Sequence, residues 1–207
     1  MYKKAQNHFK KADVVLHKAS LVHKIADIKR SKNVFEDLIR AIASQQLSGK
    51  AADTIFGRLE KLVGKNNFTA KRILKIKDSV LRECGFSNAK VVAIKSLAKA
   101  VVDKNLNLNN IHLSDDIEVM ESLTSVKGIG PWTAEMILMF SLGRTDIFSR
   151  GDLGLMKGLM HLYGWKKLPS EKKISSTIEK WSPYKTYAAR VLWKIADKKK
   201  MRLPRKR

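Results

Sequence analysis

Apolar residues recur at helical spacing along most of the chain. The recurrence is clearest in residues 35–42, 55–62 and 91–101, where an apolar side chain returns every three or four positions. No alternation of apolar and polar residues, the pattern of a half-buried strand, extends over a comparable length of the sequence. The pattern therefore predicts an all-α fold with about nine or ten helices.

Residues that favour helix ends agree with this pattern. Gly85 can end one helix and Ser87 can cap the next. Gly164 follows an apolar helical run and is expected to end it in the left-handed conformation. Near the C-terminus, Ser182 and Pro183 are predicted to be the N-cap and first-turn residue of a last helix.

The charge of the chain narrows the choice of partner. Its 207 residues include 42 Lys and Arg against 19 Asp and Glu, a formal net charge of +23. The last ten residues, 198–207, form a basic tail that includes seven Lys or Arg. A basic surface selected only for solubility would repel itself in the compact state, so a polyanion, most simply a nucleic acid, is favoured as partner.

Cysteine content and hydropathy exclude several classes of protein. The single cysteine, Cys84, excludes an internal disulfide and a cysteine-ligated iron–sulfur cluster. The basic N-terminal segment lacks the apolar core of a signal peptide, and no apolar run reaches about 18 residues. We expect an unsecreted protein of the cytoplasm or nucleoid, or of the nucleus in a eukaryote, that does not contact a membrane.

The most informative run is LTSVKGIGPWTAEMIL, residues 123–138, in which two apolar helical segments flank a Gly-Ile-Gly turn. Gly128 and Gly130 allow a tight turn and close approach of the backbone to a ligand, while Ile129 anchors the turn in the core. Pro131 suits the first turn of the following helix, whose N-terminus can bind an anion. An ordinary glycine-containing link between antiparallel helices is the alternative, but on a chain this basic the run has the pattern of a helix-hairpin-helix that holds DNA phosphate.

An acidic residue follows at a position that suits chemistry. After a loop over residues 145–151, Asp152 stands at the start of another helix. Asp is also a favoured N-cap, so its carboxylate could merely bind backbone amides. The residue alone leaves both interpretations open.

Four segments, taken together, resemble one family. Residues 35–52, 84–90, 123–138 and 181–193 are similar, in this order, to signatures of the helix-hairpin-helix (HhH-GPD) DNA glycosylases, in the branch of 3-methyladenine DNA glycosylase II. The resemblance implies a two-lobed helical fold with the active site in the cleft between lobes. It implies a glycosylase domain over 1–197 and a basic tail over 198–207. Lobe A of this domain covers about 1–48 and 147–197. Lobe B covers about 49–146 and contains the hairpin motif at 119–142.

The resemblance also implies a reaction. Asp152 matches the family's catalytic Asp, whose carboxylate stabilises the oxocarbenium character of the sugar and orients or deprotonates the attacking water. The sequence departs from the family just before it, where Ser149, Arg150 and Gly151 replace the usual Pro and extra acid. Relatives that also cleave the strand carry a Lys nucleophile where this chain has Trp132, so a monofunctional enzyme is expected.

Further site residues are carried over by the same resemblance. Gln46 and Leu47 match the family's wedge region, with a helix end packed on its neighbour as the alternative, and Ser87 is a weaker candidate for contact with the opposite strand. Trp132 and Trp181 match pocket residues that would stack on an electron-poor base, although core packing could explain either. The hairpin residues expected at phosphate are Lys127, Gly128, Ile129, Gly130 and Thr133. The main-chain carbonyls expected to hold a monovalent cation, Na⁺ or K⁺, are those of Thr124, Val126 and Ile129.

The expected function is excision of alkylated, cationic purines such as 3-methyladenine and 7-methylguanine from double-stranded DNA after base flipping, leaving an abasic site. No cofactor is expected to be required, and the protein is expected to be monomeric. A non-catalytic protein that binds damaged or bent DNA, a strand-cleaving glycosylase and an RNA-binding basic protein are the alternatives.

Overall fold

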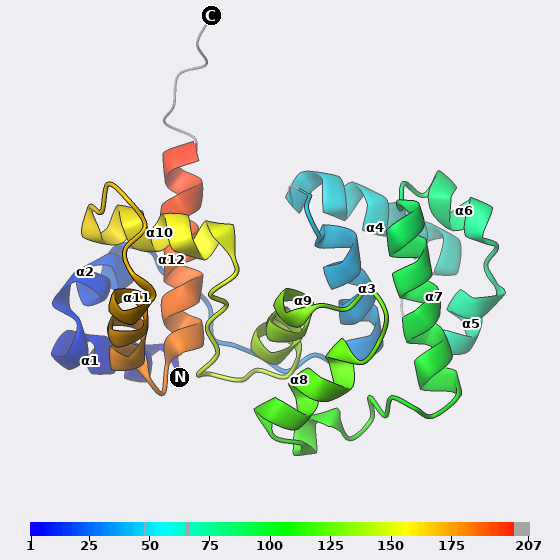
Figure 1. Cartoon of the computed structure of the whole chain (residues 1–207), viewed down its shortest axis with the longest axis horizontal. Coiled ribbons are helices and arrows are strands. Elements are labelled where there is room, and N and C mark those ends of the chain that lie inside the picture. The colour runs from blue at the N-terminus through cyan, green and yellow to red at the C-terminus, as the bar shows by residue number, and fades with distance from the viewer. Residues whose placement is uncertain (48, 65–66, 201–207) are drawn as a thin grey trace, which may run out of the picture. The chain divides into compact units, whose positions relative to one another are not determined.

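The computed structural model describes residues 1–47, 49–64 and 67–200, with side chains described as far as residue 197. Figure 1 shows a chain built of helices, and the described residues contain no strand. The all-α prediction is therefore confirmed. The chain divides into two compact units: Met1–Lys29 with Gly143–Arg207, and Arg30–Leu142.

The first unit joins the two ends of the chain. Its helices are α1 (Tyr2–Ala12), α2 (Val14–Val22), α10 (Leu153–Tyr163), α11 (Glu171–Ile178) and α12 (Lys185–Lys200), with the short 3₁₀ helix η3 (Glu179–Trp181). Helices α10 and α12 form its closest packing, because a Cβ at Gly158 of α10 would lie 2.4 Å from the Leu192 carbonyl oxygen of α12. A glycine at this position lets the two backbones approach.

The second unit is the continuous middle of the chain. Its helices are α3 (Val34–Ser44), α4 (Gly49–Val63), α5 (Ala70–Lys75), α6 (Asp78–Glu83), α7 (Asn88–Val102), η1 (Ile111–Leu113), α8 (Asp116–Thr124), α9 (Pro131–Met136) and the π-helical turn η2 (Ile137–Ser141). Helix α3 lies at its centre, with Leu38, Ile39 and Ile42 fully buried. These apolar positions are the ones that predicted the helix.

The units divide the chain at different residues from the predicted lobes. The predicted boundary lay near residue 48, whereas residues 30–48 belong to the middle unit. The reason is packing: α3 contacts α4, α7, α9 and η2, all within that unit. The amphipathic pattern of α3 predicted a buried face but could not say which helices would cover it.

The helix ends bear out some predictions and correct others. Ser87 caps α7 by accepting the Lys90 amide, and Gly164 ends α10 with φ of +68°. Twelve α-helices are described, more than expected, because α5 and α6 contain only six residues each and are too short to show a clear period. Ser182 does not cap α12; its hydroxyl donates to Asp146 Oδ2 (2.7 Å).

The described helices can be compared with the length and composition of a membrane-spanning helix. Within the described ranges, none of them combines the length and the apolar composition that crossing a bilayer requires.

Candidate functional site

The Gly-Ile-Gly run forms a tight turn between α8 and α9. Gly128 has φ of +90°, and a Cβ there would lie 2.3 Å from the Ala93 Cβ of α7. Gly130 differs, because it has an ordinary φ of −96° and a Cβ there would meet nothing within 4 Å. The close packing on α7 therefore favours glycine at position 128. At position 130 a side chain would fit, so packing does not explain the glycine there.

The two helices meet the turn as the sequence predicted. Ile129 is buried, and its amide donates to the Val126 carbonyl (3.0 Å). Pro131 occupies the first turn of α9, and Gly130, the N-cap, brings no side chain that would cover the helix N-terminus. Lys127 is exposed beside the turn. The arrangement presents backbone and one cation to solvent, which suits a phosphate group.

Gln45 fastens the end of α3 to this turn, a role that the sequence did not reveal. Its Nε2 donates to the Gly128 carbonyl (3.1 Å) and to Thr133 Oγ1 (3.0 Å). The Thr133 side chain is buried and bound to Gln45, so only the backbone amide of Thr133 is left for the predicted contact with phosphate, which stays a prediction. Gln45 and Thr133 lie 88 residues apart in the sequence, and no local pattern indicates that they form a hydrogen bond.

Lys90 of α7 holds the same helix end from the other side. Its Nζ donates to the carbonyls of Ala43 and Gln45 (both 2.8 Å), and burial lowers the pKa of its ammonium group. A cation at the C-terminal end of a helix also matches the helix dipole. Lys90 therefore fixes the segment from which the predicted wedge projects.

The two predicted wedge residues are exposed. Gln46 has φ of +56°, unusual for a residue other than glycine, and Leu47 is 42% exposed. Leu47 is therefore not a core residue, which removes the alternative of simple core packing for its side chain. Ser87, the weaker candidate, is exposed and serves as the N-cap of α7.

Trp132 lines a pocket of about 450 Å³ within the middle unit. Helix α9 and the turn η2 supply Trp132, Met136 and Phe140, and α3 supplies Asp37 and Arg40. Phe140 is 45% exposed although it is aromatic. An apolar pocket with aromatic walls and few charged groups is suited to a flat heterocycle.

Trp181 is fully buried in the structure, which differs from its predicted place at the base pocket. Its side chain is fully buried in the first unit, where its ring contacts that of Phe148 and its Nε1 donates to Asp13 Oδ2 (2.9 Å). Tyr163 donates its hydroxyl to the same carboxylate. With no exposed face, Trp181 cannot stack on a base, and its role is to close the core around Asp13.

Asp152 is the N-cap of α10 and is only partly buried. Its Oδ1 accepts the Leu155 amide (2.7 Å) and the indole N–H of Trp193 on α12 (2.9 Å). A Cβ at Gly154 would lie 3.0 Å from this oxygen and 3.0 Å from Trp193 Cδ1, so glycine at that position makes room for the pair. The carboxylate therefore both caps the helix and is held in one orientation.

Trp193 is a candidate site residue that the sequence did not reveal. No motif in the sequence marks Trp193 as a pocket residue. Its hydrogen-bond partner, Asp152, lies 41 residues away at the start of α10. The only available signal was an aromatic residue with a hydrogen-bond donor in the last of the four signature segments.

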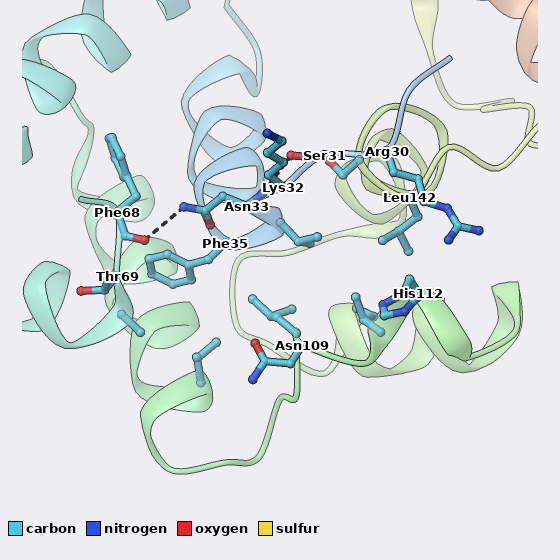
Figure 2. Close-up of a pocket in the computed structure, with 16 residues that line it drawn as sticks. Arg30, Ser31, Lys32, Asn33, Phe35, Phe68, Thr69, Asn109, His112 and Leu142 are labelled. Atoms are coloured by element: carbon cyan, nitrogen blue, oxygen red, sulfur yellow. Dashed lines mark hydrogen bonds between the residues drawn. The ribbon is translucent and has the colours of Figure 1, made fainter. Parts of the chain in front are cut away.

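Figure 2 shows another pocket of the middle unit, of about 520 Å³, between the start of α3 and the segment after α7. Asn33, the N-cap of α3, donates its side-chain amide there to the Phe68 carbonyl (3.2 Å). Arg30, Lys32 and His112 also line it. None of the predicted site residues belongs to this pocket.

Known proteins match most of the chain. It is 38% identical over 181 residues to DNA-3-methyladenine glycosylase 1 of Schizosaccharomyces pombe, which covers 84% of this chain and 79% of the relative. It is 31% identical to the DNA-3-methyladenine glycosylase of Saccharomyces cerevisiae, over 80% of this chain and 69% of the relative. The solved structure of an S. pombe 3-methyladenine DNA glycosylase in complex with abasic DNA superposes with a TM-score of 0.84 at 35% identity, covering 92% of this chain and 95% of that one.

A family match agrees with these relatives. Residues 39–183 match the HhH-GPD superfamily of base excision DNA repair proteins, a range that includes the hairpin, the pocket residue Trp132 and Asp152. The chain therefore belongs to the HhH-GPD superfamily of base excision DNA repair proteins.

Proposed function

We propose that the protein is a monofunctional DNA glycosylase that hydrolyses the N-glycosidic bond of alkylated purines in double-stranded DNA. The observation that carries this proposal is the Asp152 carboxylate, which is partly exposed and held by two N–H donors at the start of α10. The named relatives support the alkylated substrate. The solved relative with abasic DNA supports DNA as partner.

Asp152 supplies the electrostatic part of the reaction. Breaking the glycosidic bond leaves positive charge on the sugar, and a carboxylate already fixed in position stabilises that charge without reorganising. Asp152 also accepts a proton from, or orients, the water that attacks the anomeric carbon. An alkylated purine is cationic and leaves readily, so the reaction needs no general acid.

The residue after the hairpin glycines favours hydrolysis over strand cleavage. A Schiff base requires an amine nucleophile, and Trp132 has none. The net charge of +23 and the exposed Lys127 beside the turn would hold the phosphate backbone.

The monovalent cation stays a prediction. Thr124 is the last residue of α8, where carbonyl groups and the helix dipole suit a cation, and Val126 and Ile129 follow in the turn. These carbonyls would hold the ion, which when bound would attract a DNA phosphate.

Incubation of the protein with methylated duplex DNA tests the proposed function. We expect 3-methyladenine or 7-methylguanine to be released and intact strands with abasic sites to remain. Borohydride should trap no covalent adduct, because there is no Schiff base to reduce. Absence of base release would refute the proposal, and an adduct would refute the monofunctional reaction.

Replacing Trp193 with Phe tests how the carboxylate is held. Phe keeps a smaller aromatic ring at this position, but Asp152 Oδ1 loses the hydrogen bond from the indole N–H. A hydrogen bond to a charged group contributes about 1.5–3 kcal/mol, so we expect single-turnover base release to slow by about tenfold or more. Affinity for abasic DNA should not change, and a parallel loss of both would indicate a structural role instead.

A further inference from the structure

The pocket beside Trp132 contains an acid that the proposed reaction does not use. Asp37 of α3 lines this pocket together with Trp132, Met136 and Phe140. Its Oδ2 is buried, and no described residue donates a hydrogen bond to it. A buried carboxylate oxygen without a donor is costly, so a ligand that compensates its charge would be favoured there.

The nearby cation is engaged elsewhere. The Arg40 guanidinium lies 3.8 Å from the centre of the Phe56 ring, and its nitrogens lie 4.0 Å from Glu36 and 3.9 Å from Asp53. Two carboxylates therefore share the charge of Arg40. Among the described residues, Arg40 lies within ion-pair distance of Glu36 and Asp53 but not of Asp37, whose buried Oδ2 has no hydrogen-bond donor.

A structural role alone does not account for this placement. Asp37 lies in the first turn of α3, where any carboxylate gains from the helix dipole. An exposed side chain would gain the same interaction without desolvation. Burial of the oxygen beside an aromatic pocket points to a ligand instead.

We propose that Asp37 is a specificity residue of the pocket in which the proposed function places the extruded base, and that it favours N-alkylated purines that carry a positive charge over neutral purines. The inference rests on the proposed function and names the residue that sets its substrate class. Trp132 and Phe140 would attract a cationic ring through their faces, and Asp37 would supply the opposite charge. A neutral purine gains the stacking but not the charge compensation.

The test compares two lesions in the same protein preparation. Single-turnover release is measured from duplexes that contain 7-methylguanine, which is cationic, or hypoxanthine, which is neutral. We expect Asp37→Asn to lower the ratio of the two rates by about tenfold or more. Because both rates come from one sample, a partly unfolded variant does not change the ratio. Asp37→Ser, which suits a helix start and removes the same charge, provides a second variant.

Asp116→Asn is the matched control, because Asp116 stands in the first turn of α8 and does not line the pocket. Its ratio should equal that of the unchanged protein. An unchanged ratio in Asp37→Asn and Asp37→Ser would overturn the inference while leaving the glycosylase activity in place. Failure of the unchanged protein to release any methylated purine would refute the proposed function itself.

Discussion

Asp152→Asn is expected to slow base release by about 10²–10³-fold, the loss typical of removing one preorganised electrostatic group. The substitution is nearly isosteric and removes the negative charge that would face the oxocarbenium character of the sugar. Asn is as good an N-cap as Asp, so the amide oxygen can still accept the Leu155 amide at the start of α10. Single-turnover release from DNA that contains 7-methylguanine measures the effect.

Two controls separate this chemical loss from a structural one. Affinity for DNA with an abasic site should stay near that of the unchanged protein. Asp115→Asn makes the same replacement at the N-cap of α8, where Asp115 accepts the amides of Ile117 and Glu118, and should leave base release unchanged. If Asp152→Asn releases bases at the original rate, Asp152 is only a helix cap and its charge takes no part in the reaction.

Gly128→Ala is expected to lower the free energy of unfolding by about 2–4 kcal/mol, which combines a left-handed backbone with overpacking. The methyl group would lie 2.3 Å from the Ala93 Cβ and 3.0 Å from its Cα, so α7 and the hairpin would have to separate. The same movement would break the bond from Gln45 to the Gly128 carbonyl. Denaturant unfolding followed by circular dichroism measures the change.

Gly130→Ala is the matched variant two residues away. Its methyl group would enter open space at an ordinary φ, so stability should change by less than about 0.5 kcal/mol. We expect its affinity for DNA to fall, because the methyl group would occupy the space through which the backbone approaches phosphate. Equal stability of the two variants would contradict the close packing of Gly128 on α7.

Local features could be predicted because they depend on neighbours in the chain. The caps at Ser87 and Asp152, the left-handed Gly164 and the start of α9 at Pro131 all follow from residue types at adjacent positions. The exposure of Leu47 could not be decided in this way, because an apolar residue after a helix fits a core and a surface equally well.

The tryptophans show where such prediction ends. Sequence favoured Trp181 over Trp193 as a site residue, yet Trp181 is fully buried against Asp13 and Trp193 binds Asp152. The two residues lie 12 positions apart, and Trp193 meets Asp152 because α12 packs on α10, whereas Trp181 precedes α12 in η3.

Residue types and short spacings are enough to predict the helical class, the Gly-Ile-Gly turn between two helices, the basic charge and an Asp at the start of a helix at position 152. The folded chain is needed to show that Gln45 binds the hairpin, that Trp193 holds Asp152 and that Asp37 lines the pocket of Trp132. These contacts join residues 41 to 95 positions apart. Packing of whole helices sets them, and a local pattern carries no information about which helices will meet.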